Sequence, residues 1–172
     1  GIIGEKVHLF DKWQTPDWTS TRQLIKEEVL LQGIKTVYID PITNFTTKMN
    51  SSERNDFLIS MTRELAEDAA NYGFTAHVFC HYNKAPKGDK QWSQGRIPTS
   101  DDLAGSSAMA QTCNAAIGLQ VWKITEGEDK EYLNSQRVLH ILEDREFGVA
   151  EAIPLTWKPS KGKLEEQEHD DE

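Results

Sequence analysis

Residues 35–40 read KTVYID and residues 74–80 read FTAHVFC, and these two stretches decide the predicted fold. Each is a short run rich in apolar and β-branched residues, which is typical of a buried strand. Residues 18–31 and 53–71 carry apolar side chains at helical spacing, and a glycine follows each of them where a helix would end. Strands that alternate with helices predict an α/β protein with a mostly parallel, twisted sheet and helices on both of its faces.

The remainder of the chain adds more elements to this plan. A long loop rich in glycine, proline and basic residues spans residues 82–101, and loops of this length are usually functional or disordered. Small residues in 103–114 favour a helix. Further strands are expected at residues 6–10, 115–123, 136–142 and 150–157. The last two of these strands should form an antiparallel hairpin at one edge, around the turn at 144–149.

Composition places the chain among ordinary soluble domains. It has 172 residues, of which 27% are charged, and no run of 18 apolar residues that would predict a membrane span. Cys80 and Cys113 are too few for a disulfide scaffold and lack zinc-site spacing, so we expect reduced core cysteines in an intracellular protein. The first residues, 1–11, lack the layout of a secretory signal.

The net charge of -9 is concentrated at the C-terminus. Residues 164–172 (LEEQEHDDE) hold six acids and no lysine or arginine, so residues 1–163 carry only about -3. Such a balanced body neither indicates nor excludes nucleic-acid binding. We therefore expect one domain over 1–163, followed by an acidic tail that is either a solvated end or a docking segment for a basic partner.

Polar side chains follow the two buried strands. Asp40 ends the first strand, and His81 directly follows the second. Ligands of parallel sheets bind outside the carboxyl ends of the strands. Asp40 could cap a turn or associate with the Mg²⁺ of a nucleotide, and His81 could be structural or could hydrogen-bond a terminal phosphate.

Two further segments could carry chemistry. The small residues of 100–111 (SDDLAGSSAMAQ) fit either tight helix packing or a nucleic-acid loop that leads into a helix, from which Gln111 would face the phosphate site. Arg145 lies between acids in 143–148 (EDREFG). It could form a surface ion pair, or it could act as an arginine finger on the nucleotide of a neighbouring subunit.

Taken together, these segments resemble the ATPase domain of DnaB-like hexameric replicative helicases, above all the helicase half of the bacteriophage primase–helicases. The likeness extends over about residues 6–164 and rests on short motifs in the family's order. These motifs are VYIDPI (37–42), MTRELAEDAANYGF (61–74), VFCHYNKAP (78–86), DLAGSSAMAQ (102–111), CNAAIGLQ (113–120), ILEDREFG (141–148) and the closing hairpin LTWKPSKGKLEE (155–166).

The resemblance implies a RecA-like fold and an ATP-driven (or dTTP-driven) DNA helicase that requires Mg²⁺. It assigns Asp40 to the metal, His81 to sensing the terminal phosphate, Gln111 to relaying that signal, and Arg145 to the finger that acts in trans. All four would thus contact or sense the nucleotide.

The resemblance also implies partners. The intact protein would form a homo-oligomer, a hexameric ring around single-stranded DNA, in the cytoplasm of a bacterial host, and it would be encoded by a phage. The acidic tail would contact a DNA polymerase. The implied DNA-binding residues are Lys84, Lys87, Lys90, Arg96, Gly105, Ser106 and Ser107.

This sequence departs from the family pattern at three places. It contains no G-x-x-x-x-G-K-[ST] phosphate loop, so the chain is expected to be the C-terminal part of the ATPase domain. Ala104 stands where the family has arginine, and Glu143 stands where it has lysine. A non-catalytic DNA-binding or oligomerisation module, or another RecA-like ATPase such as a recombinase, are the alternative functions.

Overall fold

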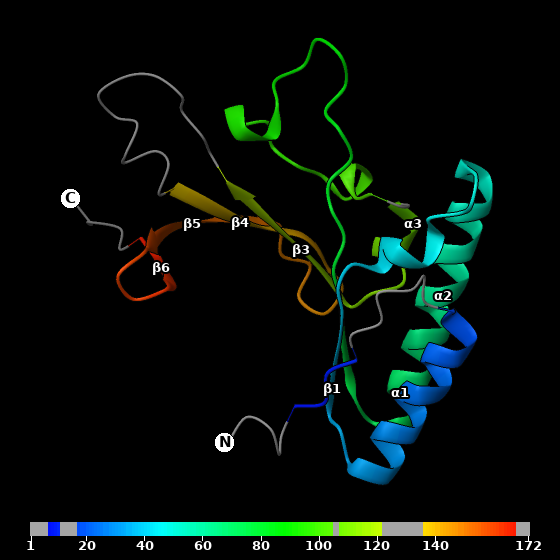
Figure 1. Ribbon diagram of the computed structural model, residues 1–172. Helices are drawn as coiled ribbons and strands as arrows, with labels where there is room; N and C mark the ends of the chain where they lie inside the picture. Colours follow the sequence, from blue (N-terminus) through cyan, green and yellow to red (C-terminus); the bar gives the residue numbers. More distant parts are fainter. Residues whose placement is uncertain (1–6, 11–16, 105–106, 122–135, 168–172) are drawn as a thin grey trace. The chain divides into compact units, whose positions relative to one another are not determined.

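The computed structural model describes residues 7–10, 17–104, 107–121 and 136–167. The chain divides into two compact units, Gly1–Cys80 and His81–Glu172 (Figure 1). Within the described residues, no helix combines the length and the apolar character that a membrane crossing needs. We describe each unit by itself.

The first unit consists of two long helices and two short parallel strands. In chain order its elements are α1 (Trp18–Gln32), β1 (Thr36–Ile39), the 3₁₀ helix η1 (Ile42–Thr46), α2 (Ser51–Tyr72) and β2 (Thr75–Val78). β1 pairs with β2 in parallel, from Thr36 opposite Thr75 to Ile39 opposite Val78. The two predicted helices and the two predicted strands are therefore confirmed as elements.

Local sequence signals set the ends of both helices. The Asp17 side chain accepts a hydrogen bond from the Ser20 amide at the start of α1, and Asn50 and Glu53 form a capping box at the start of α2. Each helix ends at a glycine, Gly33 or Gly73, with φ of 70°. Only glycine adopts this left-handed backbone without strain, so both predicted stops are confirmed.

A buried ionic cluster joins α1 to α2. Asp68 is 4% exposed, and its two carboxylate oxygens accept hydrogen bonds from Arg22 at 2.5 and 3.0 Å, while Lys26 lies 3.2 Å away. Arg22 also reaches Glu64 at 2.7 Å. The hydrogen bonds from Arg22 hold the pKa of Asp68 below its ordinary value. The cluster lies beside the core residues of α2, Leu58, Met61 and Leu65.

The second unit is built on an antiparallel sheet. Its elements are η2 (Trp92–Gln94), η3 (Ser100–Asp102), α3 (Ser107–Ala110), β3 (Ala115–Val121), β4 (Gln136–Asp144), β5 (Glu151–Lys158) and β6 (Lys163–Glu166). The four strands pair in the order β3-β4-β5-β6. The predicted hairpin around 144–149 is present as β4 and β5, and β6 extends it with a second hairpin.

The predicted RecA-like, mostly parallel sheet is wrong. The described residues form a two-stranded parallel sheet and a separate four-stranded antiparallel sheet. β3 was expected to continue the parallel sheet, but it pairs antiparallel with β4, where Ile117 lies opposite Ile141 and Leu119 opposite Leu139. An apolar strand pattern does not encode the direction of its partner, and these cross-strand apolar pairs favour the antiparallel ladder.

Three smaller expectations also change. Residues 7–10 are not a strand. Among the described residues of the helix predicted over 103–114, only Ser107–Ala110 form a helix, α3. Glu165 and Glu166 of the predicted acidic tail pair with β5 as part of β6, and residues 168–172 lie outside the described residues.

We expect Arg22→Met to lower the free energy of unfolding by about 2 kcal/mol, because the buried Asp68 carboxylate then loses its main hydrogen-bond donor. Asp68 has a lowered pKa in the folded state, so its contribution is present above about pH 4 and is lost as the pH falls through that lower value. Urea titrations between about pH 2 and pH 7 measure both effects. Glu27→Gln, an exposed change on the same helix, is the control; an equal loss in both variants would contradict the prediction.

Candidate functional site

The long loop of the second unit is closed at its neck. Residues 81–104 leave and return to the same place, because three hydrogen bonds join the two ends. Two of them form the antiparallel bridge between Tyr82 and Leu103, namely the Ala104 amide to the His81 carbonyl (2.7 Å) and the Asn83 amide to the Asp102 carbonyl (2.7 Å). The third runs from the Asn83 side chain to the Leu103 carbonyl (3.1 Å). The loop predicted to be functional thus has a defined shape.

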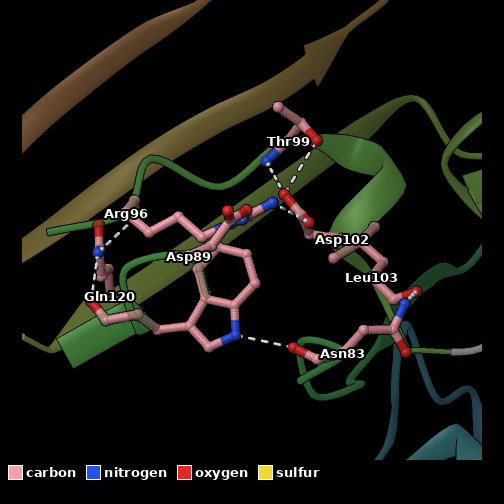
Figure 2. A network of polar contacts seen from close by, with 8 residues as sticks. Asn83, Asp89, Arg96, Thr99, Asp102, Leu103 and Gln120 are labelled. Atoms are coloured by element: carbon pink, nitrogen blue, oxygen red, sulfur yellow. Dashed lines mark hydrogen bonds and ion pairs between the residues drawn. The ribbon is translucent and has the colours of Figure 1, made fainter. Parts of the chain in front are cut away.

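Arg96 organises the interior of this loop (Figure 2). Its guanidinium forms ion pairs with Asp89 and, at 3.3 Å, with Asp102. It also lies over the Trp92 ring, 4.8 Å from the centroid, and the indole nitrogen donates to the Asn83 carbonyl at 2.7 Å. Since two carboxylates already neutralise Arg96, its charge serves the loop itself rather than an external phosphate.

The aromatic side chains of the loop are also used internally. The Trp92 ring packs against the Tyr82 ring, with centroids 5.2 Å apart, in addition to its contact with Arg96. Tyr82 in turn lies over Gly118 of β3, where an added Cβ would overlap the tyrosine hydroxyl. A side chain at position 118 would therefore require the Tyr82 side chain to shift.

A buried polar pair fastens the loop to the sheet. The Gln120 side-chain nitrogen, on β3, donates to the carbonyls of Trp92 (2.6 Å) and Arg96 (2.7 Å). Its oxygen lies 2.8 Å from Nε2 of His140, on β4. Gln120 and His140 are only 3% and 7% exposed. Burial lowers the pKa of His140, so the ring is neutral near pH 7 and donates through Nε2 to the glutamine oxygen.

Three lysines of the loop point to solvent. Lys84, Lys87 and Lys90 are exposed, and they lie in the arm between the neck and η2. Of the four cations predicted to bind DNA, these three present their charge outward, whereas Arg96 does not. Gly105 and Ser106 lie outside the described residues, and Ser107 begins α3.

The predicted nucleotide residues are divided between the two units. Asp40, in the first unit, is exposed at the carboxyl end of β1, beside Phe79, whose amide donates to the Ile39 carbonyl at 2.9 Å. His81 is an exposed residue at the loop neck. The second unit brings Gln111 and Arg145 together, because the Arg145 guanidinium donates to the Gln111 main-chain carbonyl.

The metal assignment can be tested against the donors that surround Asp40. Among the described residues, no three histidine, cysteine or acidic side chains gather as a group that could hold a metal ion. Mg²⁺ requires six oxygen ligands, most of them from water and substrate phosphates in nucleotide sites. A single strand-end carboxylate does not by itself make such a site, so the described residues do not fit a resident Mg²⁺.

Sequence reasoning missed the residues that shape the loop, above all Gln120 and His140. The signal was present in β3, where Gln120 is the single polar side chain in the run AAIGLQV (115–121). Strand alternation places it on the same face as Ala116 and Gly118, and all three are buried. A buried polar residue in an apolar strand indicates a specific hydrogen-bonded role.

No protein-family model matches this chain, and a search of curated proteins finds no match either.

We expect Gly118→Ala to destabilise the second unit by about 1–3 kcal/mol, because the added methyl group forces the Tyr82 ring away from β3. Tyr82→Phe removes the hydroxyl that the methyl group would meet, so the same glycine change should cost less in that background. Denaturant unfolding of the two single variants and the double variant measures this coupling. Equal costs in both backgrounds would show that the ring contact does not limit the position.

Proposed function

We propose that this chain is part of an ATP-dependent replicative DNA helicase and that residues 81–104 contact single-stranded DNA. Seven motifs in the order of the DnaB-like family support the helicase assignment. The observation that carries the DNA-binding role is the closed loop that presents Lys84, Lys87 and Lys90 to solvent. In the intact protein, hydrolysis at subunit interfaces would move such loops along one strand and separate the duplex.

The proposed contact is made to the phosphate backbone. Lysine ammonium groups are compact charges that bind phosphates without reading base edges. The Trp92 ring is occupied by Tyr82 and Arg96, so stacking of bases on this ring does not contribute. Binding should therefore be independent of sequence and strongly dependent on salt.

The nucleotide roles of Asp40, His81, Gln111 and Arg145 belong to the same proposal, with ATP or dTTP as the nucleotide of the intact enzyme and with Mg²⁺ that arrives bound to its phosphates, since the described residues do not fit a resident ion. A finger role in trans requires the Arg145 guanidinium to exchange the Gln111 carbonyl for a phosphate on a neighbouring subunit. From the resemblance to the phage helicases we also propose that the protein is a phage product in the cytoplasm of a bacterial host and forms a hexameric ring. Its acidic C-terminus is proposed to meet a polymerase.

A second candidate is a non-catalytic DNA-binding module. The lack of a phosphate-loop motif in the 172 residues favours it, since the backbone amides of that loop cradle the nucleotide phosphates. Both candidates use the same loop for DNA. They differ in whether Arg145 and Asp40 act on a nucleotide.

We expect Lys84→Ala, Lys87→Ala and Lys90→Ala, combined, to weaken binding of a labelled thymidine oligonucleotide about tenfold to hundredfold. Each lost phosphate contact should also reduce the slope of log affinity against log salt by about 0.7 for a single strand. Fluorescence anisotropy at several salt concentrations measures both quantities.

The control combines Lys158→Ala, Lys161→Ala and Lys163→Ala, three exposed lysines around the β5–β6 turn. This variant removes the same charge from another part of the second unit. Equal weakening by the two triple variants would mean that bulk charge, and not the loop, carries the binding.

We expect the 172-residue chain alone to hydrolyse ATP no faster than a blank, because it has no phosphate loop to hold the β- and γ-phosphates. A phosphate-release assay with Mg²⁺, with and without single-stranded DNA, measures the rate. Magnesium-dependent turnover by the pure chain, abolished by Asp40→Asn, would overturn this expectation.

A further inference from the structure

A polar side chain buried in an apolar strand requires partners for all of its hydrogen-bonding groups. The Gln120 carboxamide has two N–H donors and one oxygen, and each of them is satisfied. The donors go to two main-chain carbonyls of the loop, and the oxygen goes to His140. This saturation explains why the strand tolerates a glutamine that is 3% exposed.

The two carbonyls lie four residues apart, at Trp92, the first residue of η2, and at Arg96, which follows its C-cap glycine. One side chain therefore fixes both ends of this turn to β3. Only a group with two donors in a fixed plane can do this, which a carboxylate of the same size cannot, since it would face both carbonyls with lone pairs.

The two main-chain carbonyls determine which way the carboxamide lies, because a carbonyl can only accept a hydrogen bond. The glutamine nitrogen therefore faces the loop, and its oxygen faces His140 and accepts from Nε2. His140 is on β4, opposite Gly118, on the same face of the sheet as Gln120. β4 thus supplies the donor that the remaining polar group of Gln120 requires.

The fixed turn continues into the lysine arm through Arg96. The Arg96 carbonyl binds Gln120, while its side chain binds Asp89 and Asp102. Asp89 lies between Lys87 and Lys90 in the chain. The arm that carries the lysines is consequently linked to the sheet by an unbroken series of hydrogen bonds and ion pairs (Figure 2).

We propose that Gln120, with its side-chain oxygen paired to His140, is the positioning residue of the single-stranded DNA-binding loop. It holds the Trp92–Arg96 turn on the sheet, so that Lys84, Lys87 and Lys90 converge on one run of phosphates. This inference rests on the proposed DNA-binding function and adds to it a residue that does not touch DNA. Because these contacts order the loop before DNA binds, binding does not have to offset the entropy loss of ordering it. This preorganisation raises the affinity for single-stranded DNA.

The test uses Gln120→Glu in the full chain. We expect the backbone amides of residues 91–97 to exchange hydrogen at least tenfold faster than in the wild-type chain. Hydrogen–deuterium exchange in the absence of DNA, followed by mass spectrometry, measures this rate. We expect at least tenfold weaker binding of a labelled thymidine oligonucleotide, with a smaller salt slope. The matched control is Gln32→Glu, the same change at the exposed end of α1. A general loss of stability would lower the unfolding midpoint without changing the salt slope of the folded protein.

A second variant guards against failure to fold. His140→Leu leaves the carboxamide in place but deprives its buried oxygen of a donor, and His140→Gln restores a donor. We expect weaker binding and faster exchange in the first, and partial recovery in the second. If the wild-type chain does not bind the oligonucleotide, the proposed function fails and the positioning role fails with it. If wild type binds and folded Gln120→Glu and His140→Leu match its affinity, slope and exchange, only the present inference is overturned.

Discussion

The hydrogen-bond requirement of one buried carboxamide determines the arrangement of the second unit. Gln120 must pair three polar groups away from water, and it finds its partners on β4 and on a loop more than twenty residues earlier in the chain. An unpaired carboxamide in that position would cost more free energy than most single contacts supply. The loop, the two strands and the rings of Tyr82 and Trp92 are therefore joined by one set of contacts.

The same principle, applied to charges, organises the first unit. Asp68 is buried between two helices, and Arg22 with Lys26 compensates its charge. Charged groups are used differently in the loop, where Arg96 is neutralised by two acids and the lysines are exposed to solvent. Paired charges stabilise the structure, whereas exposed charges are available to a partner, so a count of basic residues alone does not identify the cations proposed to bind DNA. The ion pairs seen in the structure distinguish the paired cations from the exposed ones.

The motifs that support the helicase proposal and the sheets that the described residues form are separate observations. The order of the motifs is the basis for the proposed relationship to the helicases. The sheet, in contrast, differs from the expected one, because β3 pairs antiparallel with β4. Arg145 is an example of a residue whose role predicted from the motif differs from the contact that the structure shows. Its position in EDREFG (143–148) suggested a finger for a neighbouring nucleotide, and in the structure its guanidinium is bound to the Gln111 carbonyl of the same unit. Two residues assigned separate nucleotide roles from sequence are thus direct neighbours.

The sequence by itself determined the local elements. Helical spacing and the stops at Gly33 and Gly73 located α1 and α2, and short β-branched runs located β1 and β2, because these signals depend on neighbours along the chain. Tertiary structure alone decided the direction of β3, the engagement of Arg96 and the roles of Gln120 and His140. Those outcomes depend on which distant groups meet, and a pattern of apolar and polar residues does not specify its partner.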